Sequence, residues 1–121
     1  MKRIITVEYD KERKAIEIEN DALVISEEVK EVFCSDNKLK ELTLPDGAEI
    51  IYCSNNELTA LELPKGIKMI YCANNNLEEL ILPDGVEIVY CFGNQLKELK
   101  IPDSIKHIDC DPDVEKISNQ P

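Results

Sequence analysis

The residues best suited to chemistry in this chain are five cysteines, Cys34, Cys53, Cys72, Cys91 and Cys110. Each follows the previous one by 19 residues. Zinc sites are built from Cys and His pairs at close spacings such as C-x-x-C, and no such pair occurs here. A straight row of thiols also cannot surround a tetrahedral ion. The spacing therefore favours a repeated structural position, where a free Cys serves as a small buried apolar residue, over metal binding or disulfides.

His107 is the only histidine and so the obvious candidate for a general base at neutral pH. Cys110 lies three residues away, and the two together have the composition of a Cys–His nucleophile pair. The repeat described below puts Cys110 on an inward position and His107 on an outward one, and no third group orients either. No Gly-rich phosphate loop, Ser-His-Asp set or metalloprotease motif occurs. The sequence predicts no enzyme and no cofactor.

Acidic residues alternate near the end of the chain: Asp109, Asp111, Asp113 and Glu115. This alternation resembles the start of a calcium-binding loop. An EF-hand loop requires Gly at its sixth position and Glu at its twelfth, where this chain has Val114 and Gln120. We therefore expect a solvated acidic surface here and no metal site.

The cysteine period divides the chain into equal units. Residues 29–47, 48–66, 67–85 and 86–104 fit one pattern, apolar-x-x-apolar-x-Cys-x-x-Asn-x-Leu-x-x-Leu-x-Leu/Ile-Pro, and a degenerate fifth unit begins at Ile105. A constant period near 20 residues is the mark of a solenoid, in which no unit can bury its apolar face alone.

The pattern resembles the leucine-rich repeat, and in particular the short bacterial subtype of effector proteins from intracellular pathogens such as Legionella, Shigella and Yersinia. The resemblance covers residues 29–104 fully and 105–117 loosely. Two features depart from that subtype: Cys stands where an aliphatic residue is usual, and the period is about one residue short. The resemblance implies the leucine-rich-repeat superhelix class, here almost entirely strand and loop.

Stacking of the units predicts what each position does. Positions 1, 4, 6, 11, 14 and 16 are expected to form inward ladders, and the Asn at position 9 is expected to satisfy backbone groups as the chain leaves the strand. The Pro residues, mostly followed by Asp-Gly or Lys-Gly, are expected to turn the chain. At position 2 the charge alternates from coil to coil, which predicts an exposed ladder of ion pairs.

The ends of the solenoid should be closed, because a bare terminal coil exposes core and an unpaired strand edge. Residues 2–9 and 15–19 alternate apolar and polar around a charged turn and predict a β-hairpin cap. Residues 22–26 resemble the second half of a repeat. We expect three parts: a cap and partial repeat (1–28), four full units (29–104), and a degenerate C-terminal capping repeat (105–121). Both ends are thus expected to be closed and the chain complete.

The outward positions of the repeated strand carry the candidate binding site. Five of the six aromatic residues fall on positions that the pattern leaves unburied. The candidate partner-binding residues are Phe33, Ile50, Tyr52, Met69, Tyr71, Ile88, Tyr90, Phe92, His107 and Asp109. Tyr and Met are enriched at protein interfaces. The alternative reading is that the Tyr side chains simply stack and strengthen the sheet.

Charge and length exclude several functions. The chain has 121 residues, 25 acidic and 14 basic, for a net charge of −11. Such acidity disfavours nucleic-acid binding and docking on an anionic membrane. No apolar run is long enough to span a bilayer, and charges interrupt the N-terminus too early for a secretory signal.

These features predict a non-catalytic protein-binding module. By resemblance it would be a small bacterial effector or effector regulator, monomeric when free, that binds and blocks a host protein or another effector. The alternatives are the substrate-recognition part of a larger effector such as a ubiquitin ligase, or a scaffold that self-associates. Unpaired thiols favour a reducing, cytoplasmic location, with translocation into a host cell if the protein is an effector.

Overall fold

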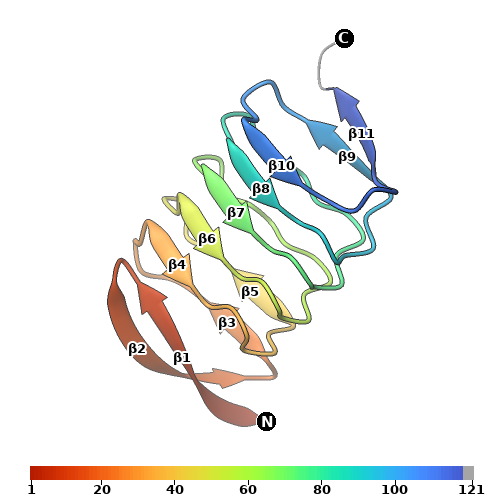
Figure 1. Ribbon diagram of the computed structural model, residues 1–121. Helices are drawn as coiled ribbons and strands as arrows, with labels where there is room; N and C mark the ends of the chain where they lie inside the picture. Colours follow the sequence, from red (N-terminus) through yellow and green to blue (C-terminus); the bar gives the residue numbers. More distant parts are fainter. Residues whose placement is uncertain (119–121) are drawn as a thin grey trace.

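The chain forms a β-solenoid of about five stacked coils with a spacing of about 19 residues, seen in a computed structural model that describes residues 1–118. Figure 1 shows the coils rising from the N-terminal hairpin to the C-terminal strands, with two walls of strands on opposite sides. The regular elements within these described residues are all β-strands.

One wall, which we call the front wall, takes one strand from each coil. Its strands are β4 (Glu31–Phe33), β6 (Ile50–Tyr52), β7 (Met69–Tyr71), β8 (Ile88–Tyr90) and β10 (His107–Asp109). All pair in parallel, and each residue faces the residue 19 positions along, as Val32 faces Ile51. Equivalent residues therefore stack in straight rows, about 4.8 Å apart from strand to strand. The predicted one-coil repeat is confirmed.

The N-terminal segment forms the predicted β-hairpin. Strands β1 (Lys2–Tyr9) and β2 (Glu12–Glu19) pair antiparallel, and β1 also pairs antiparallel with β4 at the start of the front wall. The prediction started the second strand at residue 15, which is three residues too late. Asp10 and Lys11 both have positive φ, 49° and 71°, so two residues are enough for the turn.

The opposite wall, which we call the back wall, has paired strands only at its two ends. β3 (Ala22–Val24) pairs in parallel with β5 (Glu41–Thr43), and β9 (Glu98–Ile101) pairs with β11 (Glu115–Ser118). In the β3–β5 pairing, residues 22–24 each face the residue 19 positions along, as the strands of the front wall do. The equivalent segments of the two middle coils, residues 60–63 and 79–82, form no strand.

The core follows the predicted ladders, with two corrections. Positions 1, 4, 6, 11 and 14 are buried throughout the four full units. Position 16 is only half-buried in three of its four residues, Leu82 being the exception. In the last coil Ile105, Ile108 and Cys110 are also only half-buried, because no strand within residues 1–118 pairs with the outer edge of β10.

The asparagine ladder hydrogen-bonds as predicted. Asn75 donates through Nδ2 to the carbonyls of Cys53 (3.1 Å) and Cys72 (3.0 Å), and its Oδ1 accepts from the Leu58 N–H (3.0 Å). Asn37, Asn56 and Asn94 likewise donate to the carbonyl of the cysteine in their own coil. Because each amide joins two coils, the row ties the stack together where the chain leaves the front wall.

The hairpin supplies the contacts that a preceding coil would give. The second acceptor of Asn37 Nδ2 is the carbonyl of Thr6 in β1, at 3.2 Å. A carboxylate oxygen of Asp10 accepts from the N–H groups of Lys30 (2.9 Å) and Glu31 (2.8 Å). In the next coil the matching N–H groups, those of residues 49 and 50, donate to a backbone carbonyl instead. The first coil is therefore hydrogen-bonded on both sides.

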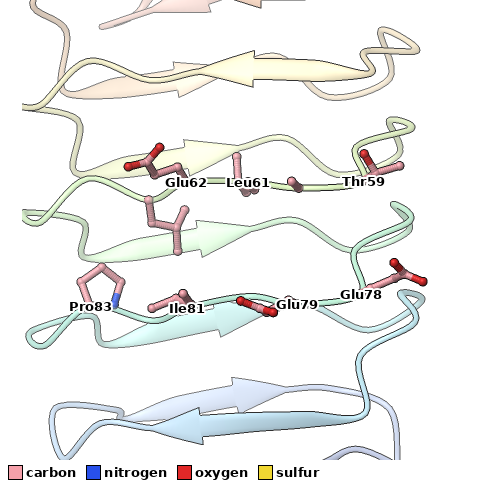
Figure 2. A pocket seen from close by; sticks show the side chains of 9 residues that line it. Thr59, Leu61, Glu62, Glu78, Glu79, Ile81 and Pro83 are labelled. Carbon is pink, nitrogen blue, oxygen red and sulfur yellow. The ribbon is translucent and has the colours of Figure 1, made fainter.

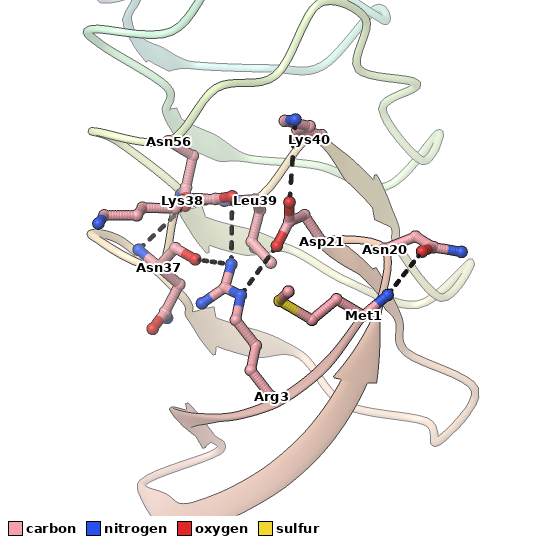
Figure 3. A network of polar contacts seen from close by, with 9 residues as sticks. All are labelled: Met1, Arg3, Asn20, Asp21, Asn37, Lys38, Leu39, Lys40 and Asn56. Atoms are coloured by element: carbon pink, nitrogen blue, oxygen red, sulfur yellow. Dashed lines mark hydrogen bonds and ion pairs between the residues drawn. The ribbon is translucent and has the colours of Figure 1, made fainter.

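A polar network at the other end of the hairpin fixes it to the first coil (Figure 3). Arg3 donates through Nε to an Asp21 carboxylate oxygen at 2.8 Å and through Nη2 to the carbonyls of Asn37 and Lys38. Lys40 lies 3.9 Å from the other oxygen of Asp21. The hydrogen bond from Arg3 lowers the pKa of Asp21 below its usual value. The arginine thus holds β1 against the loop of the first coil.

Two kinds of turn shape each coil. The Pro carbonyls at position 17 accept from the N–H three residues on, as in Pro45 to Ala48 at 3.2 Å, which confirms the predicted Pro turns. A second bend at position 8 places Asp36, Asn55, Asn74 and Gly93 at φ values of 60°, 58°, 56° and 75°. Asn, Asp and Gly are the residues that tolerate this left-handed backbone.

Candidate functional site

The outward side chains of the front wall form a continuous aromatic row. Phe33 stacks on Tyr52 with ring centroids 4.1 Å apart and planes within 5°. Tyr52 stacks on Tyr71 at 4.5 Å, and Tyr71 on Tyr90 at 4.7 Å. The straight parallel register produces this row, because it repeats every outward position at the strand spacing. We call these four residues the aromatic row.

Stacking decides which part of each ring a partner can reach. The faces of the inner rings cover one another, and all four side chains are half-buried, so a partner meets the parts of these side chains that stacking leaves exposed. The position-3 side chains Ile50, Met69 and Ile88 are half-buried beside them. The face thus offers two rigid neighbouring rows, one aromatic and one aliphatic.

The hydroxyls of the aromatic row affect one another. The pKa of Tyr71 is raised above its usual value, first by burial and then by the neighbouring Tyr52 and Tyr90 hydroxyls. The raised pKa favours the neutral form of the Tyr71 hydroxyl at the centre of the row.

The remaining predicted site residues lie at the margin of this face. The His107 ring tilts against Tyr90, at 5.2 Å and 44°, and so ends the aromatic row in the last coil. Asp109 is exposed next to it. Phe92 lies just beyond β8 and is 39% exposed, more than any member of the row. The sequence placed His107 on this face but did not predict its contact with Tyr90.

The thiols are poor nucleophiles. Burial raises the pKa of Cys34 to about 12, and burial with the nearby Cys110 and Asp111 raises that of Cys91 to about 12. The pKa values of Cys53 and Cys72 are raised as well, again mainly by burial. Because only the thiolate reacts or binds metal, these four cysteines fit a packing role. Cys110 is the one half-buried thiol.

The acidic segment after β10 contributes to local structure. A carboxylate oxygen of Asp111 accepts from the Gly93 N–H at 2.9 Å, and Val114 is buried. Within residues 1–118 no group of three or more His, Cys, Asp or Glu side chains is arranged to hold a metal ion. The alternating charges at position 2 form ion pairs between Lys30 and Glu49 (3.9 Å) and between Lys106 and Glu87 (3.5 Å).

One residue of the hairpin is part of the core. Tyr9, which the sequence only placed in the hairpin, is 2% exposed, and its hydroxyl is buried without a hydrogen-bond partner among the described residues. Burial, with Cys34 and Glu27 nearby, raises its pKa to about 12. Tyr9 alternates with the inward Ile5 and Val7, so the strand pattern could have shown that its side chain faces the same way.

The back wall carries a second surface, which lies outside the predicted binding site. Figure 2 shows a hollow between the middle coils, lined by residues of segments 59–63 and 78–83. Its volume is about 650 Å³. Ile81 stands at its edge, 72% exposed, at a position where the other full units have Thr43, Glu62 and Lys100. That departure from the repeat was the available signal.

Comparison with known protein families, with curated proteins and with solved structures found no match to this chain. Among residues 1–118 no helix is long and apolar enough to cross a membrane.

Proposed function

We propose that this chain is a non-catalytic leucine-rich-repeat protein that binds another protein through its front wall. The observation that carries the proposal is the pair of neighbouring rows on one face: the aromatic row, and the aliphatic row of Ile50, Met69 and Ile88. Tyr and Met are favoured interface residues because they offer large apolar areas, and Tyr adds a polar group at its end.

The stacking contributes to stability and to binding at the same time. Rings held 4.1 to 4.7 Å apart lose little further freedom when a partner covers their edges. Ordering of side chains is one of the main costs of association, and a rigid surface reduces it. Stacking that strengthens the sheet in the free protein is therefore compatible with the use of the same side chains to bind a partner.

The proposal extends to the ends and the setting of the protein. The hairpin is proposed to cap the solenoid, since it supplies Asn37 and the first coil with the hydrogen bonds of a missing neighbour. By the resemblance of its repeats, the protein is proposed to be a bacterial effector or effector regulator that blocks its partner. The free, buried cysteines favour a reducing compartment.

The test uses a charge placed on the front wall. Met69→Lys should weaken partner binding about 30-fold or more, because a buried charge at the centre of an apolar interface costs about 2 kcal/mol or more. The matched control is Thr43→Lys, which adds the same charge on β5 of the back wall. The measurement is affinity capture from host-cell and bacterial lysates, followed by titration of each captured protein against both variants.

The stacked tyrosines provide a second arm. A Tyr52→Ala/Tyr71→Ala/Tyr90→Ala variant, checked for folding by circular dichroism, should lose the same partners. If folded Met69→Lys and the triple variant keep every partner at unchanged affinity, the front wall is not the binding site. Loss of a partner only in Thr43→Lys would assign binding to the back wall.

A further inference from the structure

The hollow on the back wall lies where the solenoid leaves backbone groups unpaired. At the ends of this wall, β3 pairs with β5 and β9 with β11. Between them, no backbone hydrogen bond within the described residues joins segment 60–63 to segment 79–82. The hydrogen-bonded ladder of the back wall is therefore interrupted at the hollow.

The hollow also has an apolar component. The side chains of Leu61, Leu63 and Pro83 line it, and Ile81 stands over it with 72% of its surface exposed (Figure 2). A second hollow of about 450 Å³ lies on the other side of Ile81, against the next coil. A large aliphatic side chain exposed between two hollows is a candidate contact for an apolar side chain of a partner.

The charge of the hollow is one-sided. Glu62, Glu78 and Glu79 line it, and no Lys or Arg belongs to its lining. Lys97 and Lys100 line only the second hollow, on the other side of Ile81. The printed ion pairs of the described residues involve other carboxylates. A second copy of this chain, with its net charge of −11, is therefore an unfavourable occupant. A cationic segment is favoured on electrostatic grounds.

We propose that the hollow between the two middle coils of the back wall binds an extended cationic segment of a partner protein, in which Lys or Arg residues alternate with aliphatic ones. The aliphatic side chains pack against Ile81 and Leu63 in the hollow, and the longer cationic side chains reach Glu62 and Glu79, which also line it. This surface is separate from the front wall and acts independently of it.

The test uses synthetic peptides as probes. The first is acetyl-Lys-Val-Lys-Val-Lys-Val-Lys-amide, labelled for fluorescence anisotropy. A second peptide with Ser in place of Val keeps the charge and lacks the aliphatic side chains. A third with Glu in place of Lys reverses the charge. We expect the Lys-Val peptide to bind about tenfold or more tightly than the Lys-Ser peptide, and the Glu-Val peptide not to bind.

Two variants and two matched controls locate the site. Ile81→Thr, the residue that position 15 has in the first unit, should weaken Lys-Val binding about tenfold, and Glu62→Gln/Glu79→Gln should do the same. Val24→Thr is the control for Ile81→Thr. It also replaces an exposed aliphatic side chain by Thr, at a position on β3 that is 65% exposed and lies outside the hollow. Glu19→Gln/Glu41→Gln removes two charges from exposed positions on β2 and β5, also outside the hollow. Neither control should change the affinity.

Three results would overturn the proposal. The first is that the Lys-Val peptide does not bind. The second is that the Lys-Ser peptide binds as tightly as the Lys-Val peptide. The third is that the control variants weaken binding as much as the variants of the hollow. The last two would assign binding to the overall negative charge. Met69→Lys on the front wall should leave peptide binding unchanged, so this proposal and the proposed function can fail separately. Amide shifts in the NMR spectrum should centre on residues 59–63 and 78–83.

Discussion

At the residue scale, the cysteines show how packing decides chemistry. Cysteines can serve as metal ligands or nucleophiles. Four of the five are buried here, and their pKa values are raised. The burial that fits them to the core also prevents ionisation. Each buried thiol thus stabilises the fold as a small apolar side chain. This contribution lasts only while the thiol remains protonated.

This dependence predicts loss of stability in alkali. The thiols ionise in the unfolded chain near pH 8.5, but in the folded chain the pKa of Cys34 and Cys91 is about 12. Between these values the folded state binds more protons than the unfolded one. The free energy of unfolding should therefore be unaffected below about pH 8 and fall above about pH 9, by about 1.4 kcal/mol per pH unit for each buried thiol.

Urea unfolding at pH 7 to 11 measures this effect. Cys72→Ala lowers stability at every pH, but it should reduce the alkaline slope by the share of one thiol. Cys110→Ala, at the half-buried position, is the matched comparison. A slope that is the same in the wild type and in Cys72→Ala would show that the ladder thiols do not govern the alkaline loss.

At the element scale, the bend at position 8 shows what the repeat demands of the backbone. Every full unit has a positive φ there, and Gly93 is the one position of the four that lacks a side chain. The Asn74 side chain occupies the space where a Cβ of residue 93 would lie, with Oδ1 only 2.2 Å from it. Asn74 also donates to Asn55 Oδ1 at 3.0 Å. The bends of neighbouring coils are therefore packed on one another.

A double-mutant cycle tests this packing. Gly93→Ala should lower the free energy of unfolding by about 2 kcal/mol, since it adds both a left-handed Ala and a clash with Asn74. In an Asn74→Gly background the clash with the side chain is gone, and the cost should fall to about 1 kcal/mol. Thermal and urea unfolding of the four proteins give the coupling. Additive effects would mean that the bends do not interact.

The elements also show the reach of sequence reasoning. The repeat pattern predicted the front-wall strands, the buried ladders, the Asn contacts and the Pro turns, because each depends on a residue that recurs every 19 positions. It did not predict the unpaired middle of the back wall. Segments 60–63 and 79–82 have nearly the same apolar pattern as β5 and β9, so the pattern does not distinguish the coils that pair here from those that do not.

The candidate site was predicted in part for the same reason. Outward positions followed from the repeat, so Phe33, Tyr52, Tyr71 and Tyr90 were correctly placed on one face. The contact of His107 with Tyr90 depends on side-chain direction across two strands, which no single-strand pattern encodes. The burial of Tyr9 depends on the pairing of β1 with β4, a contact between the hairpin and the first coil that the alternation within residues 2–9 does not encode.

At the scale of the whole molecule, the two ends of the described solenoid differ in how well they are packed. The hairpin covers the first coil with buried Val7 and Tyr9 and pairs with its strand. In the last coil the inward Ile105 and Ile108 are half-buried. In a stack where each coil contacts only its neighbours, local stability follows the contacts on both sides.

Amide hydrogen exchange should therefore follow a gradient along the stack. The slowest exchange is expected in β6 and β7, which are paired on both sides, and the fastest strands should be β10 and β11. The hairpin end should be intermediate or slow. Mass spectrometry of peptic fragments after native-state exchange measures this directly. Equal protection along the chain would indicate that the coils open only together.

The aromatic row has one more property, which is optical. The chain contains no Trp, so its near-ultraviolet absorption and emission come from Tyr, and three of its four Tyr rings lie in one stack. Transition dipoles held parallel at 4.5 to 4.7 Å couple strongly, and this coupling depends on the spacing of the strands. The stacked Tyr rings therefore lie on the face that is proposed to bind a partner. A change in the near-ultraviolet spectrum of the protein, without any added label, should report binding at that face.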